Sequence, residues 1–170
     1  MIRRVVAIGA VLVTALLLQS TVFGELNLLG VRPELVYAVV ILIAVLEGPS
    51  EGAVVGFAGG LLQDFLLNEP KGITALTLTL LGYGMGLARQ YVSSPSPLLP
   101  MILVAAGTAG GVAFHSIVSF LIGRFDHPVT YGLRVVALTA VYGAILTPLV
   151  HPLLRRIAEG SRPRRVVRFS

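Results

Sequence analysis

Apolar residues fill most of this chain in long runs, which short breaks rich in polar residues, glycine or proline separate. The runs predict six helices, at residues 5–23, 33–46, 52–67, 73–88, 98–123 and 131–154. An α-helix needs roughly 20 predominantly apolar residues to cross a bilayer, and most of these runs come close to that length. We therefore expect an all-α polytopic membrane protein, with a single six-transmembrane-helix bundle at residues 1–154 and a basic cytoplasmic tail at residues 155–170.

The second run is short for a membrane span. Its core at residues 33–46 would be about 21 Å long at 1.5 Å per residue, whereas the hydrocarbon slab is about 30 Å thick. Three arrangements could accommodate it: the flanking residues extend the helix, the bilayer thins locally, or neighbouring helices shelter it.

Composition supports the membrane assignment. Only 12% of the residues are charged and the mean hydropathy is +0.89, whereas soluble domains carry about 25% charged residues. A cleaved signal peptide is the rival interpretation of the first run, but five further apolar runs favour a retained helix. The chain has no cysteine, which excludes disulfides, thiolate metal sites and cysteine nucleophiles.

The basic residues predict an orientation. With a cytoplasmic N-terminus, the inner side would carry nine arginines: Arg3, Arg4, Arg89, Arg155, Arg156, Arg162, Arg164, Arg165 and Arg168. The outer side would carry four basic residues: Arg32, Lys71, Arg124 and Arg134. Because cytoplasmic loops are enriched in Lys and Arg, we expect both termini in the cytoplasm. The arginine tail is then expected to bind anionic lipid and not nucleic acid, and the alternative is a docking site for a cytoplasmic protein.

A repeat of small residues dominates the third run, E-G-A-V-V-G-F-A-G-G-L-L-Q-D at residues 51–64. Gly52, Gly56, Gly60 and Asp64 recur every fourth residue, so they share one face of a helix. The three glycines favour close helix packing over a ligand groove, and we expect the stripe to form an open groove that contacts a partner helix. The alternative is that the stripe packs internally against the second or fourth run. A carboxylate in a membrane helix, as at Asp64, indicates a functional site by default.

Polar residues from four runs are expected to converge on the outer half of the bundle. The candidate pocket comprises Arg32, Glu34, Asp64, His115 and Arg134. Buried membrane charges usually pair, so Arg32, Lys71 or Arg134 is the expected partner of Asp64. The alternatives are an Asp64 that snorkels or pairs only with the adjoining Lys71, and a His115 that is simply hydrogen-bonded in the core.

No catalytic or metal-binding pattern stands out. The sequence has no H-E-x-x-H motif, phosphate loop or Ser-His-Asp spacing, and a lone histidine makes no metal site. We therefore expect neither enzymatic activity nor a cofactor. Glu47 and Glu51 bracket the turn after the second run and could receive a basic partner on the cytoplasmic side.

An ordered series of motifs resembles the bacterial rod shape-determining protein MreD family. The matching motifs are R-P-E-L at residues 32–35, E-G-x-x-E-G-x-x-x-G-F-x-x-G-L-x-x-D at residues 47–64, G-x-x-A-L at residues 72–76 and L-G-Y-x-x-G at residues 81–86. Outside residues 32–88 the chain matches the family in length and character alone.

The resemblance implies a non-catalytic scaffold of the cell-elongation complex in the bacterial inner membrane. Its implied partner is an MreC-like single-span protein, with MreB, RodA and a class B penicillin-binding protein in the same machinery. It also implies a fold similar to the substrate-binding components of energy-coupling vitamin transporters. The alternative function is substrate capture for such a transporter, although the absence of tryptophan argues against a ligand pocket with aromatic walls.

Overall fold

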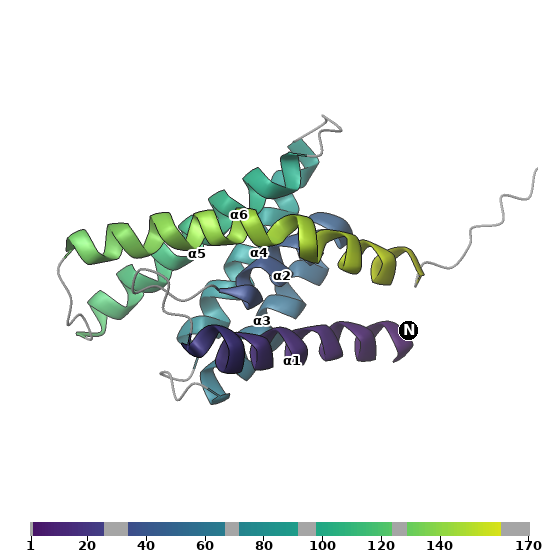
Figure 1. Ribbon diagram of the computed structural model, residues 1–170, viewed down its shortest axis with the longest axis horizontal. Helices are drawn as coiled ribbons and strands as arrows, with labels where there is room; N and C mark the ends of the chain where they lie inside the picture. The colour runs from purple at the N-terminus through teal and green to yellow at the C-terminus, as the bar shows by residue number, and fades with distance from the viewer. Residues whose placement is uncertain (1, 26–33, 67–71, 92–97, 124–128, 161–170) are drawn as a thin grey trace, which may run out of the picture.

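Six helices make up the described part of the chain, and no strand occurs there. The computed structural model describes residues 2–25, 34–66, 72–91, 98–123 and 129–160. The helices are α1 (Ile2–Glu25), α2 (Leu35–Glu47), α3 (Pro49–Leu66), α4 (Ile73–Tyr91), α5 (Leu99–Leu121) and α6 (Val129–Gly160) (Figure 1). The predicted all-helical architecture and the six helices are confirmed, with ends within three residues of those expected except at α6, which ends at Gly160 and not at residue 154.

The short helix α2 lies at the centre of the bundle. It packs against each of the other five helices, and its residues Leu35 to Val45 are all buried. Its sequence is almost entirely Leu, Ile, Val and Ala, and a helix that is hydrophobic on every face is typical of such a central position. Of the three arrangements expected for this short run, the structure therefore has the one in which neighbouring helices shelter it.

A single glycine joins α2 to α3. Gly48 has a φ angle of +108° and its N–H bonds to the carbonyl oxygen of Ala44, which ends α2. Pro49 then begins α3 immediately, at a position where a missing N–H costs nothing. Because only glycine adopts this backbone conformation easily, it allows the chain to reverse within one residue. The predicted turn at residues 47–51 is thus shorter in the structure.

The outer surface of the bundle is apolar. Large hydrophobic side chains are exposed on α1, α3, α4, α5 and α6, among them Leu17, Val54, Leu80, Ile102 and Ile145. By length and composition, Leu99–Leu121 and Gly132–Arg156 could each cross a membrane, with mean hydropathies of 1.7 and 1.8, and shorter apolar helices lie at Val5–Thr21 and Leu35–Glu47. Water would disfavour such a surface, whereas lipid tails match it.

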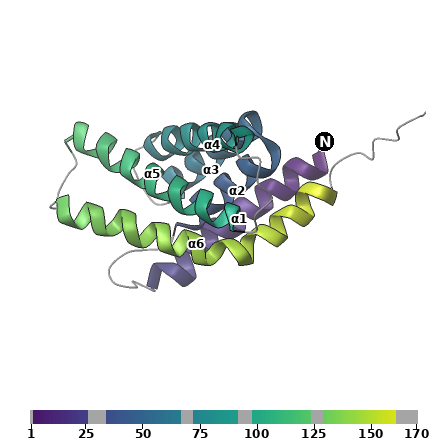
Figure 2. The same cartoon turned by 90° about the horizontal axis from the view of Figure 1, so that it is seen from above.

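Helix α1 begins and helix α6 ends at the same end of the bundle. Figure 1 shows the start of α1 and the end of α6 together on the right, and Figure 2 shows these two helices side by side there. α5 and α6 diverge at the opposite end (Figure 2). Helix α6 continues through Pro148 and Pro152 to Gly160, so residues 155–160 of the expected tail are helical. Residues 161–170 lie outside the described residues.

Candidate functional site

The glycine stripe of α3 faces α4 inside the bundle. A Cβ atom added at Gly56 would lie 2.6 Å from the carbonyl carbon of Leu78, and one at Gly60 would lie 2.6 Å from the amide nitrogen of Ala75. At Gly52 the corresponding distance to the carbonyl oxygen of Gly82 is 2.6 Å. These distances are too short for any side chain. The backbones of α3 and α4 can therefore approach this closely only because these three positions are glycine.

The expectation of an open groove at Gly52, Gly56 and Gly60 requires correction. All three residues are buried, and α4 already occupies the face that they form. Of the alternatives that the sequence left open, the structure has internal packing. Sequence alone did not separate them, because glycines at every fourth position suit contact with any helix, whether it belongs to the same chain or to another.

A cluster of polar side chains joins α1, α2 and α3. The carboxylate of Glu34, at the start of α2, accepts hydrogen bonds from Nε2 of Gln19 at 2.9 Å and Nε2 of Gln63 at 3.2 Å. Gln19 also accepts a bond from the backbone N–H of Val36 at 3.2 Å. Both glutamines are buried and Glu34 is half-buried, so this cluster ties three helices together largely away from the surface. Gln19 and Gln63 were not singled out from the sequence, although a lone amide in an apolar run was the available signal.

The two glutamines are expected to differ in their contribution to stability. Gln19→Leu removes two hydrogen bonds and leaves the Val36 N–H without its acceptor, which predicts a loss of about 2 kcal/mol. Gln63→Leu removes one bond, but it also removes Oε1, a buried oxygen with no partner among the described residues, so its cost should stay below about 1 kcal/mol. Thermal unfolding of both variants in the same detergent measures the difference, and equal losses would contradict this assignment.

Asp64 binds the beginning of α4. Its carboxylate is fully buried and accepts hydrogen bonds from the backbone N–H groups of Gly72 at 2.7 Å and Ala75 at 3.3 Å. The first N–H groups of a helix have no partner within the helix, and its N-terminus carries partial positive charge. A buried carboxylate is favourable at this position, and Asp64 thereby fastens the end of α3 to the start of α4.

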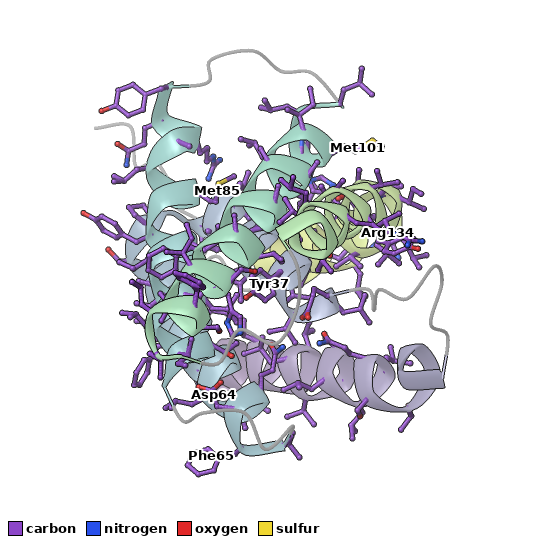
Figure 3. All side chains as sticks on the ribbon, turned by 90° about the vertical axis from the view of Figure 1, so that its left-hand side faces the viewer. Tyr37, Asp64, Phe65, Met85, Met101 and Arg134 are labelled. Atoms are coloured by element: carbon purple, nitrogen blue, oxygen red, sulfur yellow. The ribbon has the colours of Figure 1, made fainter. Side chains whose placement is uncertain are left out.

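The residues of the expected outer pocket do not all meet. Figure 3 places Asp64 and Arg134 on different sides of the bundle, and Arg134 is exposed on α6. Arg134 is therefore not the partner of Asp64. His115 is half-buried on α5, one turn beyond Gly111, which packs against the ring of Tyr37. Arg32 and Lys71 lie outside the described residues. Of the five residues of the expected pocket, Glu34 belongs to the polar cluster, and Asp64 directly follows the cluster residue Gln63 on α3.

The other end of the bundle carries the second acidic pair. Glu47 is the last residue of α2 and is half-buried, whereas Glu51 is exposed in the first turn of α3. Beside them, Nη1 of Arg89 donates a hydrogen bond of 2.7 Å to the carbonyl oxygen of Leu46. A cation at the C-terminus of α2 complements the negative end of its dipole. Arg89 therefore fastens α4 to α2 here.

Two apolar grooves open on the surface. One, of about 380 Å³, lies between α1 and α6 over α2. The other, of about 350 Å³, lies between α5 and α6, where these helices diverge, and small residues such as Ala113, Ser116 and Gly132 line it. Ser116 donates to its own helix at the carbonyl oxygen of Val112, which is the common behaviour of serine in membrane helices. Within the described residues, no three His, Asp or Glu side chains gather as a metal site would need.

Comparison with known proteins identifies one family. The family model for the rod shape-determining protein MreD matches residues 2–157, nearly the whole chain. The chain matches no curated protein and no solved structure. The match extends well beyond residues 32–88, where the motifs lie, and includes α1 to α5 and all but the last three residues of α6. The chain therefore belongs to the MreD family of membrane proteins, whose role is in determining the rod shape of bacterial cells.

Proposed function

We propose that this protein is a non-catalytic scaffold of the cell-elongation complex in the bacterial inner membrane, where it binds an MreC-like single-span partner. The observation that carries the proposal is the family match over residues 2–157. In this role the protein would support MreB, RodA and a class B penicillin-binding protein during synthesis of the side wall. The two acidic residues Glu47 and Glu51 would face cytoplasmic components.

All six helices are proposed to be membrane-embedded, with both termini in the cytoplasm. The apolar exterior supports an environment of lipid, and the start of α1 and the end of α6 at one end of the bundle agree with an even number of crossings (Figure 1). The nine-to-four distribution of basic residues favours the cytoplasm for that end. We also propose that the fold is similar to that of the substrate-binding components of energy-coupling vitamin transporters. No observation favours a function in substrate capture.

The partner helix is proposed to contact the groove between α5 and α6. Association between membrane helices depends on close packing, because lipid tails are as apolar as the helices themselves. Ala113 and Gly132 supply the small residues that such packing needs, beside the exposed side chains of Ile117 and Phe120. The glycine stripe of α3 does not offer this surface, since α4 covers it.

The experiment is co-purification of the full chain with an MreC-like partner from detergent extracts, with reporter fusions at both termini as a check of orientation. The wild-type chain is expected to retain the partner. Gly132→Phe is expected to lower retention at least tenfold, because it fills the groove, while the yield of folded protein stays unchanged. Gly84→Phe is the matched control, since both glycines have open space where a side chain would start.

Failure of the wild-type chain to retain the partner would overturn the scaffold proposal. Normal retention by Gly132→Phe would place the contact on a different face. A periplasmic signal from the C-terminal reporter would overturn the orientation.

A further inference from the structure

The groove between α1 and α6 has apolar walls and a closed floor. Its α1 wall runs from Ala7 to Leu18, with every lining residue on one face of the helix, and Val150 and Leu153 form the α6 wall. Leu35 and Val39 of α2 close the bottom. From Ala7 to Leu18 the groove extends over about 17 Å of helix. It is thus an elongated open groove of about 380 Å³ with an almost wholly hydrocarbon surface.

Basic residues cluster at one end of this groove. Arg155 and Arg156 are exposed on α6 just beyond Leu153, and Arg3 lies one turn before Ala7 on α1. Because the start of α1 and the end of α6 lie side by side (Figures 1 and 2), these positions fall at the same end of the groove. No acidic residue lines the groove itself. A hydrocarbon groove that ends at a concentration of positive charge matches a molecule with an apolar chain and an anionic head.

We propose that this groove binds an anionic phospholipid, with one acyl chain along the groove and the phosphate at the arginine end. The alanines Ala7 and Ala10 leave the space that the chain would occupy. Arg155 and Arg156 would hold the phosphate through charge-assisted hydrogen bonds, in an orientation that keeps the headgroup at the membrane surface. The site goes beyond adhesion of the arginine tail to a charged bilayer, because it binds one lipid molecule at a defined place.

Charge complementarity distinguishes this occupant from the other two candidates. A partner helix or a second copy of the chain would fill the groove through packing contacts alone, whereas an anionic lipid would also use the exposed Arg155 and Arg156 at the end of the groove. Neither groove has a basic residue in its lining, and the groove between α1 and α6 has the two adjacent exposed arginines Arg155 and Arg156 just beyond its end. The proposal rests on a membrane location alone and does not require the MreC-like partner.

The test measures phospholipid retained by the full purified chain. The protein is exchanged into micelles that contain phosphatidylglycerol or phosphatidylethanolamine with identical acyl chains, and native mass spectrometry counts bound lipid. Preferential retention of phosphatidylglycerol is expected. Arg155→Gln with Arg156→Gln should lower that retention on the order of twentyfold, because each arginine near an anionic surface contributes roughly a factor of five. Arg134→Gln, an exposed arginine at the far end of α6, is the control.

Filling the groove tests the acyl-chain part separately. Ala10→Phe is expected to lower phosphatidylglycerol retention at least tenfold, whereas Ala58→Phe, at an exposed alanine of α3, should leave it unchanged. The folded yield of each variant is scored beside the bound lipid. Because no partner is present, a failure here leaves the scaffold proposal standing.

Four results would overturn the lipid site. Equal retention of phosphatidylglycerol and phosphatidylethanolamine would show that the charge of the headgroup does not contribute to binding. Loss with the arginine variant but not with Ala10→Phe would indicate surface electrostatics alone. If Ala10→Phe leaves lipid retention unchanged but dissociates a dimer of the protein, the groove would be assigned to a second copy of the chain. If Ala10→Phe leaves lipid retention unchanged but no longer co-purifies with the MreC-like partner, the groove would be assigned to the partner helix.

Discussion

Gly56→Ala is expected to prevent α3 from packing on α4 and to remove most of the folded protein. The added methyl group would lie 2.6 Å from the carbonyl carbon of Leu78, and the nearest atoms belong to the backbone of α4. A flexible side chain could move aside, but a helix backbone cannot move without separating the two helices. The expected loss is about 3 kcal/mol or more, at the upper end of the cost of overpacking. Monodisperse yield in detergent and the thermal unfolding midpoint measure it.

Gly84→Ala is the matched control for this prediction. Gly84 lies in α4, as an exposed helical glycine with nothing within 4 Å of the position where a Cβ would stand. Alanine is favoured over glycine in a helix by about 1 kcal/mol, so this variant should be neutral or stabilised. A Gly56→Ala protein as stable as Gly84→Ala would show that α3 and α4 do not pack as described.

Asp64→Ala is expected to release the first turn of α4 and to destabilise the bundle by about 3 kcal/mol, given the cost of losing hydrogen bonds to a charged group. The carboxylate accepts bonds from Gly72 and Ala75, and both N–H groups lose that acceptor in the variant. Asp64→Asn retains one acceptor oxygen but not the charge that complements the helix dipole, so its loss should be about 1 kcal/mol. Thermal unfolding and hydrogen exchange at residues 72–76 measure both effects.

Glu51→Gln is the control for the loss of a carboxylate. Glu51 also lies in the first turn of a helix, but it is exposed, so solvent can replace its interactions and the change should be within about 0.5 kcal/mol. If Asp64→Ala matched this control, the bonds to Gly72 and Ala75 would contribute nothing to stability.

The location of the helices was largely predictable from sequence. Long apolar runs, with Pro49 beginning one helix and Gly48 and Gly72 at turns, define each element locally. The hydrocarbon interior also allows little else, because each backbone polar group there needs a partner within the protein. The main difference concerns α6, which was expected to end at residue 154 and continues to Gly160.

The polar contacts were only partly predictable. Glu34 and Asp64 were identified as charged residues in or beside apolar runs, but their partners were not. Gln19 lies 15 residues from Glu34 in the chain and Gln63 lies 29 residues from it, and no local pattern specifies which polar groups meet over such separations. The bonds that Asp64 accepts from the N–H groups of Gly72 and Ala75 were not anticipated, and two of its three expected cationic partners, Arg32 and Lys71, lie outside the described residues.

Sequence by itself determined that the protein is all-helical, apolar on its exterior and asymmetric in its basic residues, and its ordered motifs indicated the family. Each of these properties depends on residue types and local spacing. Only the tertiary structure decided that α2 is central, that Gly52, Gly56 and Gly60 face α4, and that the open grooves lie along α6. The reason is physical: helix faces in lipid are sorted by close packing and not by hydrophobicity, and packing depends on the shapes of all six helices together.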